Sequence, residues 1–316
     1  MSSPQSLSLK RRFFQKRAIR YNNAMEPLSL GVRRLYALFF FAIFVIVLPI
    51  VGLYASGYRL QGFSLVPTGG VYVSAPVSGF LISLNGEASA RSGLFSHSFF
   101  FDNLAPGSYV VQASADGYYP WSKTLIVESR VVSDVQVLAI QQPLIVRELI
   151  IATSSALSAE SATSTMRVIS AAEYRDLGAV FAATTTAAEA ATGEMPGTAR
   201  VVADEGAGAV LVIEDGDLFM RWEDRRAPPS SFCARPSQCD IAFALEDGEE
   251  TVTDSSFFAG GVLYRTEASG VYFSEADIRP PRLVIPVYTE PGASYRIISG
   301  NLYIENKGSL FEVVGF

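Results

Sequence analysis

Hydrophobic residues along the chain form one long unbroken run and many short alternating ones. The long run covers residues 35–58, LYALFFFAIFVIVLPIVGLYASGY, and carries no formal charge. As an α-helix rising about 1.5 Å per residue, it would span roughly 36 Å, enough to cross a hydrocarbon core of about 30 Å. A core helix of a globular domain usually keeps a polar stripe, and this run has none. The pattern predicts a transmembrane helix over residues 35–58.

The charge of the chain differs in sign on the two sides of this run. Residues 1–34 form a basic arm in which Glu26 is the one acidic residue, whereas the whole chain has a formal net charge of −6. By the positive-inside rule, the arm lies in the cytoplasm and the residues after about 58 lie outside it. Because the arm leads into an apolar segment, we expect it to meet the lipid bilayer and not a nucleic acid. Its basic residues are Lys10, Arg11, Arg12, Lys16, Arg17, Arg20, Arg33 and Arg34.

A cleaved signal peptide is the alternative interpretation of the same run. Ala55-Ser56-Gly57 offers small residues for a cleavage site. However, the basic arm and the apolar run are both longer than the corresponding parts of a usual signal peptide. We therefore favour an uncleaved, single-pass anchor.

Beyond the anchor, short segments of alternating hydrophobic and polar residues follow one another between turn residues. Asn85-Gly86 and Asp116-Gly117 are strong turn signals, and Ala105-Pro106-Gly107 breaks the chain between two such segments. β-Branched and aromatic residues are frequent, as in strands. The pattern predicts a small β-sandwich over residues 66–141. Its strands are expected at residues 71–74, 80–84, 98–102, 108–115 and 123–127, with a last one near 131–140.

Four blocks of this region share a pattern with a known family. They are Thr68-Gly69-Gly70-Val71-Tyr72-Val73-Ser74, Ser78-Gly79-Phe80-Leu81-Ile82-Ser83-Leu84-Asn85-Gly86, Leu104-Ala105-Pro106-Gly107-Ser108-Tyr109-Val110-Val111 and Gly117-Tyr118-Tyr119-Pro120-Trp121. In these blocks the chain resembles the PEGA domain, a small β-sandwich of bacterial and archaeal surface proteins. The family's Pro-Glu-Gly-Ala stands here as Pro76-Val77-Ser78-Gly79-Phe80, one residue longer and without the acid. The resemblance implies a β-sandwich displayed at a cell surface.

Aromatic residues gather at the end of the last block. Tyr118, Tyr119 and Trp121, with residues 99–101 as further members, are a candidate platform for sugar rings or for a partner surface. The alternative is that these side chains pack in the core and at the sheet edge. The sequence does not separate the two interpretations.

The composition changes after the sandwich. Residues 142–199 are rich in Ala, Ser and Thr, which is typical of a connector. A short helix is expected at 171–181, with Ser170 as N-cap and Glu173 at the third helical position, followed by a linker at 184–199. Short β segments return over residues 200–316, at 209–213, 218–222, 261–266, 270–274, 282–287, 294–299, 301–305 and 310–314.

This distal part resembles propeller-like segments that follow a membrane helix and a PEGA domain in some bacterial proteins. At this length it holds only two or three blades, so we expect an open sheet or a partial propeller rather than a closed ring. The fold class is therefore mainly β: a transmembrane helix, a PEGA-type sandwich and a β-rich distal domain.

The two cysteines, Cys233 and Cys239, lie close together in a proline-containing loop. Two cysteines do not complete a structural zinc site, and their spacing is not that of a C-x-x-C redox motif. Outside the cytoplasm we expect them to form a disulfide, and two buried free thiols are the alternative.

Candidate catalytic residues are few. His97, the single histidine, lies in a Ser-rich segment without a nucleophile-elbow motif. Phosphate-loop, dinucleotide and zinc-protease motifs are absent from the sequence. Acidic residues cluster at Glu214, Asp215 and Asp217, and again at Glu246, Asp247, Glu249 and Glu250. We expect these carboxylates to be solvated side chains at hairpin tips. The alternatives are a calcium site and a glycosidase-like pair of acids.

These features lead to one functional hypothesis. We expect a non-enzymatic membrane protein without a cofactor or metal, which displays its β-rich body for adhesion, scaffolding or binding to envelope polysaccharide or surface proteins. The alternatives are a sensor or assembly subunit of an envelope complex and, less favoured, an extracytoplasmic hydrolase.

Overall fold

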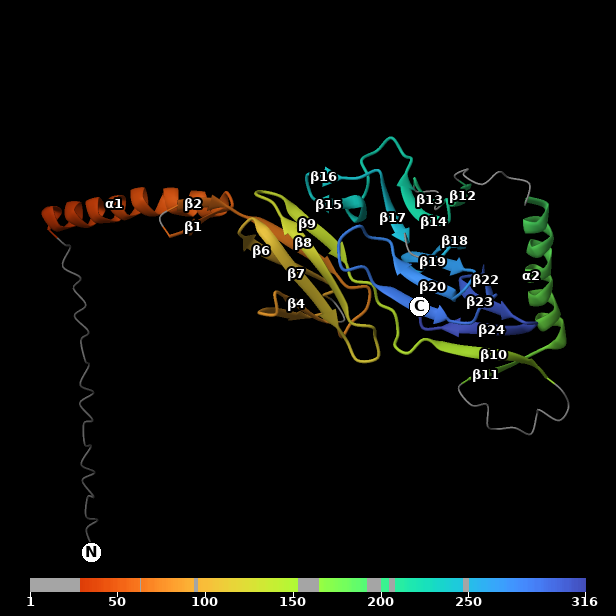
Figure 1. The fold of residues 1–316 in the computed structure, drawn as a ribbon. Helices are drawn as coiled ribbons and strands as arrows, with labels where there is room; N and C mark the ends of the chain where they lie inside the picture. Colours follow the sequence, from red (N-terminus) through yellow and green to blue (C-terminus); the bar gives the residue numbers. More distant parts are fainter. Residues whose placement is uncertain are drawn as a thin grey trace, which may run out of the picture. The chain divides into compact units, whose positions relative to one another are not determined.

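The structure is a computed structural model that describes residues 29–316 except 63, 94–95, 153–164, 192–199, 205–207 and 247–249. The chain divides into two compact units, one ending at Gly52 and the other covering Leu53–Phe316. The second unit consists mainly of β-strands in several sheets (Figure 1). The expected fold class, mainly β after one apolar helix, is confirmed.

Helix α1 covers Leu30–Ala55 and is long and apolar enough to cross a membrane. It begins before the predicted residue 35. The prediction started after Arg33 and Arg34 because charged side chains are unfavourable in hydrocarbon, but arginine is a good helix former. The Arg33 N–H donates to Ser29 O at 3.0 Å. It ends before the predicted residue 58, since Gly57 adopts a φ of +76°. The predicted helix exists, but both of its expected ends were wrong.

A short hairpin follows the helix. Its strands are β1, Tyr58–Gln61, and β2, Ser64–Pro67, which pair antiparallel. The Thr68 hydroxyl donates to Gly57 O at 2.9 Å and so closes the base of the hairpin. Tyr58, which the sequence analysis placed at the end of the membrane span, is therefore a strand residue.

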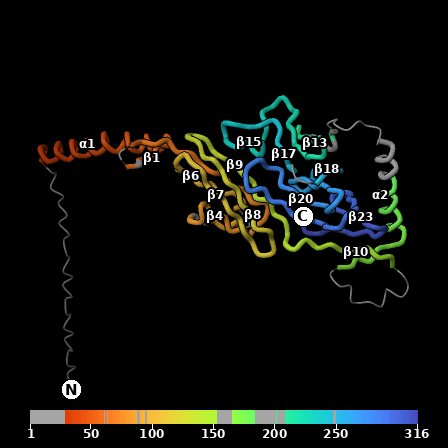
Figure 2. Tube along the Cα trace, viewed as in Figure 1, coloured from red at the N-terminus to blue at the C-terminus, as the bar shows by residue number. Residues whose placement is uncertain are grey.

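Two facing sheets form a β-sandwich between residues 69 and 136. One sheet has the strand order β6-β3-β9 and the other β5-β4-β7-β8. Figure 2 traces this part of the chain, coloured from orange to yellow-green. All neighbours are antiparallel except β3 and β9, which run parallel. The strands are β3 (Gly69–Ser74), β4 (Leu81–Leu84), β5 (Ala88–Arg91), β6 (Ser98–Leu104), β7 (Gly107–Ser114), β8 (Trp121–Val127) and β9 (Val132–Gln136).

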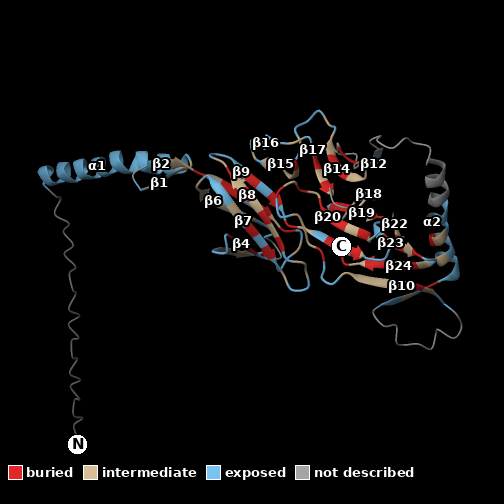
Figure 3. Cartoon of the chain, in the orientation of Figure 1, coloured by how far each residue is buried: buried red, intermediate tan, exposed pale blue. Residues whose placement is uncertain are grey.

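Buried and more exposed residues alternate along strands of both sheets, as the colours of Figure 3 show for this part of the chain. The core of the sandwich therefore lies between the two sheets. Val71 and Val73 come from one sheet and Ile82 and Val111 from the other, and all four are fully buried. The strands predicted in this region are present with shifted ends, except that β5 was not predicted, since Ala, Ser and Arg have little strand propensity.

Three further sheets make up the distal part. Two are four-stranded and antiparallel, in the orders β12-β13-β14-β17 and β18-β19-β20-β21, and the third has the order β11-β10-β24-β23-β22. A two-stranded ladder, β15 (Cys233–Arg235) with β16 (Gln238–Cys239), follows the 3-10 turn η2 (Ser230–Phe232). The remaining strands are β10 (Ile145–Ile151), β11 (Met166–Ile169), β12 (Arg200–Asp204), β13 (Ala209–Glu214), β14 (Asp217–Trp222), β17 (Ala242–Glu246), β18 (Val252–Phe258), β19 (Gly261–Thr266), β20 (Gly270–Glu275), β21 (Val284–Tyr288), β22 (Ser294–Ile298), β23 (Asn301–Asn306) and β24 (Ser309–Val314).

The prediction of a connector over residues 142–199 was wrong in part. Strand β10 pairs antiparallel with β24, and β11 pairs parallel with β10, so both belong to the distal sheet. Local composition did not reveal them because their partner strand lies at the far end of the chain. Residues 192–199 of the expected linker lie outside the described residues.

Helix α2, Ala171–Ala191, is longer than predicted. Its start agrees with the sequence analysis, since the Glu173 N–H donates to Ser170 Oγ at 3.1 Å. The expected linker from residue 184 was wrong as far as Ala191, because Ala favours continuation of a helix. Leu177 and Phe181 pack with Leu149 and Leu310 and hold α2 against the distal sheet.

A first prediction concerns Gly69 at the start of β3. A Cβ at this position would lie 2.2 Å from Glu128 O and 2.8 Å from Val131 O, both backbone atoms. Gly69→Ala should destabilise the protein by about 1–3 kcal/mol, because only a backbone shift relieves the overlap. Urea unfolding of the full chain in detergent, followed by tryptophan fluorescence, measures the change.

Gly178→Ala in α2 is the matched control. No heavy atom lies within 4 Å of its Cβ position, so the substitution should stabilise slightly through helix propensity. Equal urea midpoints for Gly69→Ala and the unchanged protein would contradict the close approach of β3 to the chain at residues 128–131.

Candidate functional site

The sandwich meets the distal part along strands β8 and β9, and we call this contact region the junction. On the distal side it is formed by η2, β15 and the segment from Glu275 to Leu283. The Thr124 N–H donates to Pro280 O at 2.7 Å, and the Ile278 N–H donates to Ser231 O at 2.9 Å. Main-chain hydrogen bonds therefore join the segment to β8 on one side and to η2 on the other.

A buried ion pair lies at the centre of the junction. The Lys123 ammonium has no solvent exposure and lies 2.9 Å from Glu275 Oε2. It also donates to Arg279 O at 2.7 Å and to Pro281 O at 3.0 Å. One carboxylate and two carbonyl oxygens thus replace the water that a lysine in β8 would otherwise keep.

Glu275 is held from three directions. Besides Lys123, the Trp121 indole donates to Oε1 at 2.8 Å and the Leu283 N–H to Oε2 at 3.2 Å. Burial raises the pKa of Glu275, and the Lys123 ammonium and the hydrogen bonds oppose that rise. The side chain of Glu275, at the end of β20, therefore joins this strand to β8.

A second buried ion pair lies beside the first. Arg279 binds the Asp277 carboxylate through both Nε and Nη2, with a closest distance of 2.6 Å. Its Nη1 donates across the junction to Asp134 O at 2.7 Å. Because the guanidinium is planar and fully charged, this arrangement fixes β9 relative to the segment that carries Arg279.

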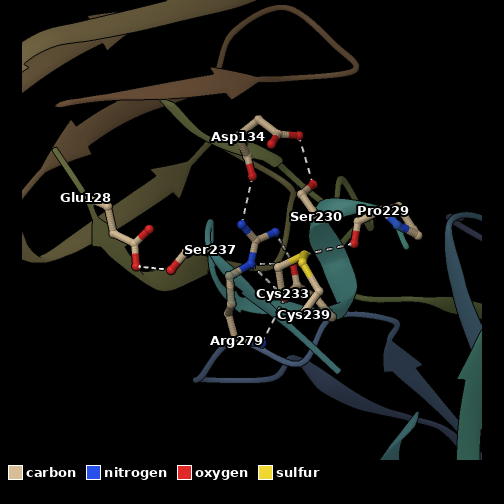
Figure 4. The surroundings of a disulfide bond; sticks show 9 residues. Glu128, Asp134, Pro229, Ser230, Cys233, Ser237, Cys239 and Arg279 are labelled. Atoms are coloured by element: carbon tan, nitrogen blue, oxygen red, sulfur yellow. Dashed lines mark hydrogen bonds and ion pairs between the residues drawn. A yellow bond between two sulfur atoms is a disulfide. The ribbon is translucent and has the colours of Figure 1, made fainter. Parts of the chain in front are cut away.

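The disulfide loop contacts the sandwich from the distal side (Figure 4). Cys233 and Cys239, whose pairing the sequence predicts, are joined in the structure. Ser230, which precedes the closed loop, donates from Oγ to Asp134 Oδ2 at 2.8 Å, and Ser237, which lies inside it, donates from Oγ to Glu128 Oε1 at 2.6 Å. The loop closed by the disulfide and the residues just before it are therefore both hydrogen-bonded to the sandwich.

Two cavities border the junction. One of about 300 Å³ lies between β8, β9 and the disulfide loop, with Arg279 in its wall. The other, of about 1120 Å³, lies between the outer face of β3 and β9 and the distal residues Met220 and Trp222. The larger cavity exceeds the range of about 300–1,000 Å³ that is usual for small-molecule sites, and Asp134 borders both cavities.

The candidate platform of Tyr118, Tyr119 and Trp121 needs a correction. Trp121 is only 2% exposed and its indole is bonded to Glu275, so it offers no surface to a ligand. Tyr118 is half-buried and packs on Phe80, with ring centroids 5.2 Å apart. Tyr119 is half-buried against the core of the distal sheets. Tyr118 therefore packs with the core of the sandwich, whereas Trp121 and Tyr119 contact the distal part.

Three of the acidic residues singled out in the sequence form contacts that are separate from one another. Glu214 pairs with Arg221 at 2.6 Å, Glu246 accepts a hydrogen bond from the Tyr264 hydroxyl at 3.1 Å, and Glu250 accepts one from Ser269. Burial and the Glu246 carboxylate raise the pKa of Tyr264. Asp247 and Glu249 lie outside the described residues, and His97 is exposed. Within the described ranges, no group of three His, Cys, Asp or Glu side chains is placed to hold a metal ion.

Sequence reasoning missed Lys123, Glu275 and Arg279. Lys123 carried a detectable signal, because it stands in phase with Trp121, Leu125 and Val127 on the inward face of β8. A charged residue at an inward position requires a buried partner. The sequence did not show which residue is that partner, because Glu275 lies far from Lys123 along the chain.

A second prediction tests the central ion pair. Lys123→Met should destabilise the protein by about 3–5 kcal/mol, because it leaves the Glu275 carboxylate buried without its counter-charge. The double variant Lys123→Met with Glu275→Gln should recover part of this loss, since no net charge is then buried. Urea unfolding of the full chain measures both. Arg226→Ala, which removes the surface pair with Asp224, is the control and should leave the midpoint nearly unchanged.

A third prediction concerns the disulfide. Replacing Cys233 and Cys239 together by Ser should lower the free energy of unfolding by about 2 kcal/mol, because the bond closes a short loop. Dithiothreitol should lower the urea midpoint of the unchanged protein and leave that of the double variant where it is. A midpoint that is insensitive to both changes would show that the loop is held by its other contacts alone.

Comparisons with known proteins do not identify a family. No family model matches the chain, and no curated protein matches it. Among solved structures, the chain is similar to the Bacillus anthracis TIE protein at 11% identity and a TM-score of 0.22. That match covers 79% of this chain and 48% of the other. So distant a likeness assigns neither fold nor function, and the PEGA resemblance stays a sequence-based expectation.

Proposed function

We propose that the chain is a single-pass membrane protein that displays a β-rich body outside the cytoplasm, where it binds a component of the cell envelope. The observation that carries the proposal is helix α1, in which the protein itself buries no residue. Twenty-six largely apolar residues exposed to water would be costly, at about 25 cal/mol for each Å² of apolar surface. A bilayer removes that cost.

Charge and redox chemistry support the orientation. Arg33 and Arg34 lie at the start of α1, and six more basic residues precede them in the sequence, in a part of the chain outside the described residues. The positive-inside rule places this end in the cytoplasm. The Cys233–Cys239 disulfide is stable in an oxidising compartment, which agrees with an external body.

We propose binding rather than catalysis, because the charged groups of the junction are engaged in structural contacts. Glu275 is bonded to Lys123 and Trp121, and Asp277 to Arg279. A general acid or base needs a proton-exchanging atom that reaches substrate. In this proposal the sandwich is of the PEGA type and the body is a rigid support for an envelope contact.

A fourth prediction tests the orientation. Intact cells that produce the chain with an N-terminal tag, and with a C-terminal tag on a flexible linker, are treated with an external protease. The C-terminal tag should be lost, while a membrane-bound N-terminal fragment remains and resists extraction with alkaline carbonate. Lysed cells, in which both tags are accessible, are the control.

The binding part is tested separately with the full chain in detergent and purified fragments of the producing cell's envelope. The chain should sediment with the fragments. A control chain that is first unfolded in urea and then diluted into the same buffer just before the measurement should not. Survival of the C-terminal tag on intact cells would contradict the orientation. A chain that stays in the supernatant with all envelope fragments would contradict the binding role.

A further inference from the structure

The outer face of the sheet β6-β3-β9 carries aromatic and polar side chains in rows across its three strands. In one row, Tyr72 of β3 lies between Phe100 of β6 and Asp134 of β9. In the next row, Ser74 lies between Ser98 and Gln136. We call these six residues the aromatic face. Flat rings in one row and hydrogen-bonding groups in the next are a suitable pattern for a ligand that has both apolar and hydroxyl surfaces.

The rings of this face are exposed although they are large and apolar. Phe100 is 58% exposed and Tyr72 is 40% exposed. A Cβ built on Gly70 would lie 2.8 Å from the ring of Phe100, so the ring lies directly over this glycine. Gly70 therefore lets Phe100 lie close to the sheet, with one ring surface toward solvent.

The aromatic face continues into the larger cavity of the junction. Tyr72, Ser74, Asp134 and Gln136 line this cavity, which has a volume of about 1120 Å³. Trp222 lies in its other wall, fixed by a hydrogen bond from its indole to Arg226 O at 2.7 Å. The ion pairs of the junction hold the two walls at a set separation, so the site is formed before a ligand arrives.

Charge narrows the chemistry of the ligand. Asp134 is the charged member of the aromatic face. In the cavity wall Asp277 is neutralised by Arg279 and Glu275 by Lys123, so Asp134 supplies the uncompensated negative charge among these residues. This carboxylate disfavours anionic polymers and the anionic surface of a bilayer. A neutral ligand that presents flat C–H surfaces and hydroxyl groups fits both the charge and the aromatic pattern.

We propose that the aromatic face and the cavity beside it bind a neutral glycan chain. Sugar rings stack on Phe100 and Tyr72, and their hydroxyl groups bond with Asp134, Gln136 and Ser74. This inference rests on the proposed function and specifies the class of envelope component.

The test uses the full chain in neutral detergent and two defined neutral glycans, cellohexaose and chitohexaose. Binding is measured by isothermal titration and by the fluorescence of the tryptophans, since Trp222 lines the cavity. At least one hexamer should bind, and Tyr72→Ala and Phe100→Ala should each raise its Kd about tenfold. Leu81→Ala is the matched control, because Leu81 is 41% exposed on the other sheet, and it should leave the Kd unchanged.

Three outcomes would overturn the inference. They are failure of both hexamers to bind, equal losses in the Leu81 control and the aromatic variants, and binding of phosphatidylcholine vesicles, instead of glycans, that depends on Tyr72 and Phe100. Sedimentation with envelope fragments separates this inference from the proposed function. If the unchanged chain and both aromatic variants sediment equally, the glycan site is wrong and the envelope-binding role stands. If none of them sediments, the envelope-binding role fails as well.

Discussion

A lysine without solvent exposure determines how the body of this protein is assembled. An ammonium group at an inward position of β8 is tolerable only where fixed oxygen atoms replace its water. Glu275 and the carbonyls of Arg279 and Pro281 supply those atoms, and all three come from the distal part. The sandwich therefore cannot bury Lys123 by itself. It reaches its lowest free energy only when the distal sheets are folded beside it.

The other contacts of the junction become understandable from this requirement. The Glu275 carboxylate can be buried because it accepts hydrogen bonds from Trp121 and Leu283 in addition to its ion pair with Lys123. Arg279 and the serines beside the disulfide then fix β9 and the end of β8 from the same side. These contacts join the sandwich and the distal sheets directly, which agrees with the single compact unit from Leu53 to Phe316.

The sequence predicted those features that depend on neighbouring residues. Strands such as 81–84 and 107–114 follow from local alternation, and the start of α2 follows from Ser170 and Glu173. The features it missed depend on residues far apart in the sequence: β10 pairs with β24, and Lys123 forms an ion pair with Glu275. The sequence left open whether the aromatic residues form a platform or pack in the core, because residue type alone does not tell which face of a strand a ring occupies. The phase of Trp121 with Leu125 and Val127 shows it to be inward, whereas Phe100 alternates outward.

The pairing of β10 with β24 also affects how the protein is made. Strand β10 is translated well before its antiparallel neighbour β24, which ends at Val314. The Gln141 N–H donates to Gly315 O at 2.7 Å. Phe316 packs edge-on against Phe258, with ring centroids 5.0 Å apart. One edge of β10 therefore stays unpaired until β24 has been synthesised. A nascent chain in which synthesis has passed β10 but not β24 carries an open strand edge, and such an edge is a template for pairing with other chains.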